Sequence, residues 1–103
     1  MKTKQIKVGF KTYEVQEGTF KEGQGNMGYH DSMEGIIYIA SKDFPNEENV
    51  NTLIHELLHA LWREYNLDRE NEEHYVTVLA NGLTRLMQDN PEMFKEMLKD
   101  LKQ

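Results

Sequence analysis

The segment that follows Pro45 constrains the fold of this chain more than any other part of the sequence. Its apolar residues recur at the three- and four-residue spacing of one helix face. They are Val50, Leu53, Ile54, Leu57, Leu58, Leu61 and Trp62. Asn46 or Asn49 can serve as the N-cap, and Asn66 can end the segment. A long amphipathic helix is therefore predicted between Pro45 and Asn66.

Two further helices are predicted after this one. The first starts near Asp68 or Asn71 and keeps the helical spacing of apolar residues as far as Met87. Asn90 and Pro91 then suit the end of one helix and the start of the next, with asparagine as N-cap and proline at the first helical position. The third helix presents Phe94, Met97, Leu98 and Leu101.

The first 45 residues have the composition of strands and loops. Apolar residues alternate with polar ones over residues 6–10 and 13–16, which predicts a hairpin. Residues 17–35 are rich in glycine and are expected to form a loop that a short strand can interrupt. The apolar run 36–40 predicts a covered strand. The expected fold is α+β, in one domain of residues 1–103: a small antiparallel sheet, made of the hairpin and the strand near 36–40, followed by three helices.

Composition excludes several classes of protein. The chain has no cysteine, which rules out a disulfide framework, a thiolate zinc site and a cysteine nucleophile. No apolar run is long enough to span a membrane, and the basic segment 1–7 lacks the apolar core of a signal peptide, so a cytoplasmic protein without a membrane partner is expected. Residues 46–103 hold six basic residues against twelve acidic ones, which disfavours binding to nucleic acid.

The chemistry of the chain is indicated by His55-Glu56-Leu57-Leu58-His59, inside the first predicted helix. Side chains four positions apart lie on one helix face, so the two imidazoles can bind one zinc ion. Glu56 lies beside this pair and can accept a proton from a water molecule that the metal activates. The less specific interpretation is a pair of exposed or capped histidines on an amphipathic helix.

A catalytic zinc site usually has a third protein ligand. A glutamate in the first turns of the second helix, packed antiparallel to the first, could supply it. Glu72 lies nearest the centre of the apolar stripe of that helix, whereas Glu73 lies at its edge. A ligand of a solvent-accessible metal is expected at the edge, so Glu73 is favoured and Glu72 stays as the alternative.

These residues resemble a zincin metallopeptidase of the gluzincin kind, whose third ligand is a glutamate on a following helix. Residues 28–31, 36–39 and 52–61 are also similar to small phage and prophage zinc peptidases and to the minimal peptidase domain of the ImmA/IrrE type. The resemblance covers roughly residues 28–95. It implies that an edge strand beside the active-site helix pairs with the substrate backbone, a place that residues 36–40 would take. It also implies a donor that stabilises the transition state; the candidates by residue type are Tyr29, His30, Tyr65, His74 and Tyr75.

The expected function is that of a zinc-dependent endopeptidase acting on a peptide or protein substrate. His55, His59 and Glu73, or Glu72, would hold one Zn²⁺, and Glu56 would be the general base. The alternative is a metal-stabilised, phage-type binding or inhibitor module that docks on a host protein without cleaving it. Glu56 distinguishes the two, because a structural zinc site has no use for an unliganded carboxylate beside the metal. The sequence does not specify an oligomeric state.

Overall fold

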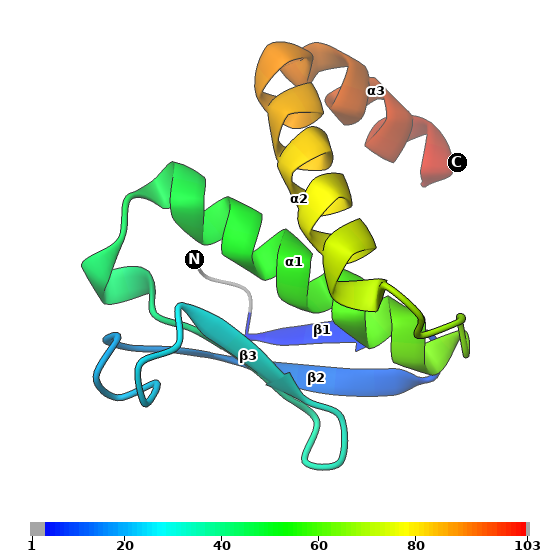
Figure 1. The fold of residues 1–103 in the computed structure, drawn as a ribbon. Helices are drawn as coiled ribbons and strands as arrows, with labels where there is room; N and C mark the ends of the chain where they lie inside the picture. Colours follow the sequence, from blue (N-terminus) through cyan, green and yellow to red (C-terminus); the bar gives the residue numbers. More distant parts are fainter. Residues whose placement is uncertain (1–3, 103) are drawn as a thin grey trace.

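The computed structural model describes residues 4–102, so the first three residues of the basic N-terminal segment lie outside the described part. The structure is an α+β fold in which a four-stranded sheet precedes three α-helices, as expected (Figure 1). Its elements are β1 (Gln5–Val8), β2 (Lys11–Glu17), β3 (Gly28–Asp31), β4 (Ile36–Ile39), a short 3-10 turn η1 (Ser41–Asp43), α1 (Asn46–Glu64), α2 (Glu72–Asp89) and α3 (Pro91–Leu101).

The sheet is mixed, and the expectation of a purely antiparallel sheet is wrong for one pair of strands. The strand order is β1-β2-β4-β3, with antiparallel pairing of β1 with β2 and of β3 with β4. The central pair, β2 and β4, is parallel. The segment between these two strands contains β3, which takes the outer edge of the sheet, and the chain then turns back into β4 beside β2. This arrangement depends on β3, which lies in the glycine-rich segment 17–35, where a loop with a short strand is expected.

The core lies between one face of the sheet and α1, which runs across it (Figure 1). The strand side chains on this face form one buried cluster with Ala60 of α1. Leu53 and Leu57 are partly buried and pack against this cluster. The buried strand residues are Val8, Tyr13, Val15, Ile37 and Ile39. The hydroxyl of Tyr13 donates to Glu64 Oε1 at 3.3 Å, and burial, reinforced by the Glu64 charge, raises the pKa of Tyr13. The C-terminal turn of α1 is thereby tied to the sheet.

The start of α1 differs from the expected cap, whereas its end is the expected one. The N-cap is Pro45, and Asn49 lies inside the helix, where its side-chain amide donates to the carbonyl oxygens of Ser41 and Phe44. The helix ends at Glu64, and Asn66 follows with a φ of 51°, the left-handed conformation expected of a residue that ends a helix. Asparagine therefore stabilises both ends of α1, at one end from within the helix.

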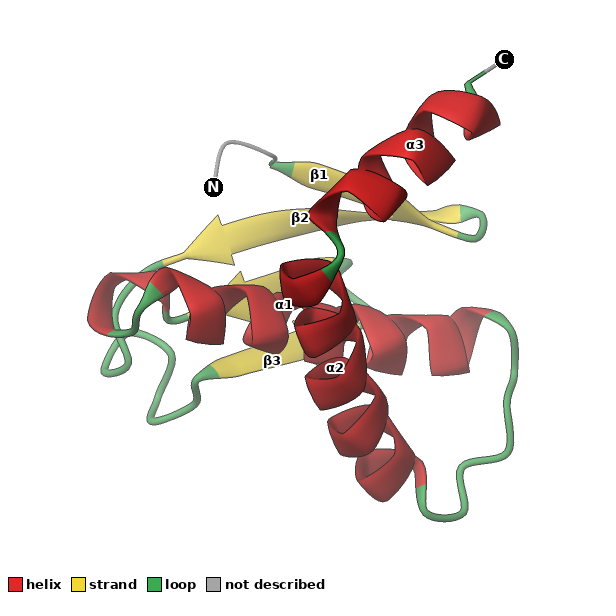
Figure 2. Ribbon diagram, turned by 90° about the horizontal axis from the view of Figure 1, so that it is seen from above, coloured by secondary structure: helices red, strands yellow, loops and turns green. Residues whose placement is uncertain are grey.

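The second helix crosses α1 and does not lie antiparallel along it (Figures 1 and 2). It buries Val76, Ala80 and Thr84, which share one face at four-residue spacing. Asn71, at the N-cap position, also has a left-handed φ, of 61°. The crossing brings the first turn of α2 close to the middle of α1, where the two histidines lie.

The third helix begins at Pro91, as expected, and lies at the far end of α2, apart from the sheet (Figure 1). Much of its apolar stripe stays exposed, with Leu98 60% and Leu101 80% accessible. None of the helices within residues 4–102 combines the length and the apolar character needed to cross a membrane.

Glycine is required where β3 passes over α1. A Cβ on Gly28 would lie 2.5 Å from Thr52 Cγ2 and 3.0 Å from the backbone oxygen of Tyr38. Both distances are shorter than ordinary van der Waals contact, and one of the two atoms belongs to the backbone. The absence of a side chain at Gly28 therefore sets how closely β3 approaches α1.

We expect Gly28→Ala to lower the free energy of unfolding by about 1–3 kcal/mol, the usual cost of overpacking. Gly82→Ala is the matched control. Gly82 lies within α2 with nothing within 4 Å of an added Cβ, so alanine there should raise stability by about 0.5–1 kcal/mol. Urea denaturation of the two variants and the parent chain measures both effects. A Gly28→Ala chain as stable as the parent would contradict the close approach of β3 to α1.

Candidate metal centre

His55 and His59 lie one turn apart on α1 and face the start of α2. Their Nε2 atoms are 3.2 Å apart, and their ring centroids are separated by 4.9 Å. The helix fixes this geometry, since side chains at positions i and i+4 project from the same face. The expected pairing of the two imidazoles is therefore present in the structure.

Glu73, in the first turn of α2, completes the group. Its carboxylate spans both rings, with Oε1 3.0 Å from His55 Nε2 and Oε2 2.8 Å from His59 Nε2. The hydroxyl of Thr77, one turn further along α2, donates to Glu73 Oε1 at 3.3 Å. The ligand atoms of His55, His59 and Glu73 all lie within 4.8 Å of one another, so this group could hold a metal ion.

Glu72 has a different position from its neighbour. Its Oε2 lies 2.6 Å from Nδ1 of His59, on the side of the ring that faces away from Glu73. The Glu72 side chain is 16% accessible, against 71% for Glu73. Carboxylates that bind the second nitrogen of a metal-ligating histidine fix its tautomer and ring orientation. The two glutamates considered as alternatives thus contact opposite nitrogens of the same ring.

The electrostatics of the group favour a cation at its centre. Because Glu72 accepts the proton of His59 Nδ1, the Nε2 atom of a neutral His59 carries a lone pair. That lone pair faces the Nε2 atom of His55 and a carboxylate oxygen of Glu73, at 3.2 and 2.8 Å. Three electron-rich atoms at this spacing repel one another unless a proton or a metal ion lies between them.

The spacing also fits a tetrahedral metal. Ligand atoms at about 2.0–2.1 Å from a tetrahedral zinc ion are about 3.3–3.4 Å apart. The two Nε2 atoms lie 3.2 Å apart, close to this spacing, while Glu73 contacts His59 Nε2 through Oε2 at 2.8 Å and His55 Nε2 through Oε1 at 3.0 Å. With one ligand atom from each residue, the three atoms lie within 4.8 Å of one another. Two imidazole nitrogens and one carboxylate oxygen form a ligand set that suits zinc better than calcium or magnesium.

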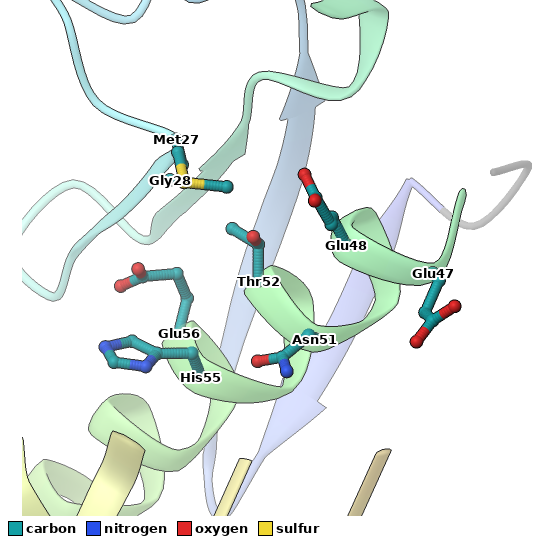
Figure 3. Close-up of a pocket in the computed structure, with 8 residues that line it drawn as sticks. All are labelled: Met27, Gly28, Glu47, Glu48, Asn51, Thr52, His55 and Glu56. Carbon is teal, nitrogen blue, oxygen red and sulfur yellow. The ribbon is translucent and has the colours of Figure 1, made fainter. Parts of the chain in front are cut away.

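Glu56 projects from α1 in another direction, toward β3. It is buried, with its side chain 9% accessible, and it lines a cavity of about 420 Å³ (Figure 3). The cavity is bounded by the N-terminal half of α1 and the start of β3, and Figure 3 shows the Glu56 carboxylate beside the His55 ring. Its walls comprise Met27, Gly28, Glu47, Glu48, Asn51, Thr52, His55 and Glu56. An unliganded carboxylate therefore lies next to the candidate metal centre and at the end of a cavity.

The edge strand beside this cavity is β3, and the expectation that residues 36–40 form that edge is wrong. β4 lies inside the sheet, between β2 and β3. The amide of Ala40 donates to the oxygen of Met27, which makes these two residues a hydrogen-bonded antiparallel pair. Hydrogen-bonded and non-bonded pairs alternate along such strands, so the backbone N–H and C=O groups of Gly28 and His30 point to the free edge.

The structure brings one of the five candidates for a transition-state donor to the site. His30 contacts Glu56, with 3.3 Å between Nδ1 and Oε1. Tyr29 stacks on Tyr38, while the rings of His74 and Tyr75 contact each other on α2. Tyr65 lies beyond the end of α1 and is 63% accessible.

Sequence reasoning missed two features of the site. One is the contact of Glu72 with His59, and the other is the contact of His30 with Glu56. The helical phase of Glu72 gave some indication of the first, but local spacing contains no signal for the second, since His30 comes from a distant strand.

In comparisons with known proteins, no family model matches the chain, and no curated protein and no solved structure matches it. The resemblance to zincin peptidases therefore stays a prediction from the sequence. The support for a function therefore comes from the geometry of the site.

We predict that Glu73→Gln weakens zinc binding more than Glu72→Gln, because the first removes a charged ligand and the second removes the partner of a ligand. Loss of such a partner typically costs about 10–100-fold in metal affinity. Isothermal titration of the metal-free variants with Zn²⁺ measures both affinities. Glu70→Gln removes the same charge from an exposed position just before α2 and should have little effect. The reverse ranking of Glu72 and Glu73 would assign the ligand role to Glu72.

Proposed function

We propose that the chain is a zinc-dependent endopeptidase. The observation that carries the proposal is the position of Glu56, a buried carboxylate beside a candidate metal centre that does not need it as a ligand. A site that only held the fold together would gain nothing from burying a further negative charge next to its metal. A hydrolytic site requires such a group as its general base.

His55, His59 and Glu73 would hold the zinc ion, and Glu72 would keep His59 in the tautomer that leaves Nε2 free. A bound zinc ion supplies Lewis-acid chemistry: it polarises the scissile carbonyl and acidifies the attacking water. Glu56 accepts the proton of that water and delivers it to the leaving amine. Each of these roles is assigned to a side chain on α1 or in the first turn of α2.

The substrate would bind as an extended peptide along the free edge of β3. Gly28 and His30 offer outward-facing backbone groups there, and Gly28 also borders the cavity that contains Glu56. A peptide that formed backbone hydrogen bonds with these groups would be extended and would lie beside Glu56. Backbone pairing of this kind recognises the main chain more than particular side chains, and it is compatible with a peptide or protein substrate.

We predict that Glu56→Gln leaves zinc content and fold intact and abolishes most of the cleavage. Glutamine keeps the shape and the hydrogen-bonding reach of glutamate but cannot take the proton of the water. The expected loss is about 10²–10⁴-fold in kcat, with KM little changed. The assay is cleavage of a peptide library by the zinc-loaded chain, read by mass spectrometry as new peptide termini.

Glu48→Gln is the matched control, since Glu48 lines the same cavity from an exposed position and has no assigned catalytic role. It should cleave at a rate close to that of the parent chain. If the zinc-loaded parent yields no new termini from the library or from lysate proteins, the peptidase proposal fails. The docking module remains as the interpretation in that case.

A further inference from the structure

His30 is the residue of β3 that contacts the proposed general base. Its Nδ1 atom lies 3.3 Å from Glu56 Oε1, and both side chains are largely buried, 17% and 9% accessible. The contact joins two segments 26 residues apart in the sequence. The side chain of His30 shares a sheet face with Gly28, whose close approach to Thr52 and Glu56 brings this part of β3 against α1.

The ring of His30 is held in a fixed orientation. It stacks on the ring of His59, with 5.2 Å between centroids and 13° between planes. His59 is itself fixed by the contact of its Nδ1 with Glu72. In this orientation the Nδ1 atom of His30 points toward Glu56.

The chemistry of the two groups determines which of them donates this hydrogen bond. A carboxylate accepts and does not donate, so the Nδ1 atom of His30 must carry the proton. Within residues 4–102, Glu56 makes this hydrogen bond through Oε1, and no fully buried side-chain oxygen lacks a partner. Oε2 of Glu56 is therefore not fully buried, and Glu56 lines the cavity, from which a water molecule could approach it.

We propose that His30 is a positioning residue for Glu56. It donates from Nδ1 to Oε1 and so leaves Oε2 as the atom that accepts the proton of the attacking water. The backbone groups of the same residue face the free edge of β3, so His30 would align the substrate backbone and the general base together. This inference rests on the proposed peptidase function, because positioning of Glu56 matters only if Glu56 is the base.

The test compares three substitutions of His30 in the zinc-loaded chain. The amide nitrogen of asparagine is as many bonds from Cα as Nδ1 of histidine, whereas that of glutamine corresponds to Nε2. His30→Ala should lower kcat by about 10- to 100-fold, as expected for loss of a hydrogen bond to a charged group, with KM and zinc affinity nearly unchanged. His30→Asn should recover most of this loss, and His30→Gln should recover much less. The asparagine and glutamine variants decide the question even if the alanine variant fails to fold.

A double-mutant comparison separates positioning of Glu56 from an independent role. If His30 acts through Glu56, then His30→Ala should reduce the residual rate of a Glu56→Gln chain little further. Equal losses in both backgrounds would overturn the proposal. So would parent-like cleavage by His30→Ala, equal rates for the asparagine and glutamine variants, or a loss of zinc affinity, which would make His30 part of the metal site.

A measurement independent of activity reports the hydrogen bond itself. Nitrogen-15 NMR of histidine-labelled, zinc-loaded chain should show His30 protonated at Nδ1, with the signal assigned by its loss in His30→Asn. A bare Nδ1 atom could not donate to Glu56 and would overturn the proposal. If the parent chain shows the expected tautomer but no cleavage, the peptidase proposal fails, and the positioning role fails with it. Cleavage by the parent chain with a bare Nδ1 atom would overturn the His30 proposal alone.

Discussion

Two imidazole nitrogens and one carboxylate meet between α1 and α2, and the rest of the site depends on this arrangement. The two Nε2 atoms and the Glu73 carboxylate lie 2.8 to 3.2 Å apart, in the acidic part of the chain. Without a cation or a shared proton, this arrangement would oppose the crossing of the two helices. A metal ion at this point would attract both helices and link binding to stability, because such a site exists only in the folded chain.

Different faces of α1 contact different parts of the molecule, and this separation makes the site possible. Leu53, Leu57 and Ala60 pack on the sheet, and the two histidines face α2. Glu56 lies on a third side, against β3. One helix thus supports two of the three candidate metal ligands and the proposed general base at fixed spacing. The sheet then adds an edge strand with free backbone groups beside that base.

Local sequence patterns were sufficient for the helices and for the pair His55 and His59, because spacing along a helix determines which side chains share a face. The same reasoning favoured Glu73 at the edge of the α2 stripe, where the structure brings it to the two histidines. The strand order was not predictable in this way. β3 is short and half polar, and its place at the edge depends on hydrogen bonds between strands that no local pattern encodes. The contact of His30 with Glu56 was missed for the same reason.

The central claim is that one metal ion lies among His55, His59 and Glu73. The most direct measurement is a crystal structure of the zinc-loaded chain with an anomalous difference map recorded at the zinc absorption edge. The predicted result is one strong peak per chain at about 2.0–2.1 Å from both Nε2 atoms and from an oxygen of Glu73, with Glu72 still on Nδ1 of His59. A map without a peak between the two helices, or with zinc held elsewhere on the chain, would contradict the claim.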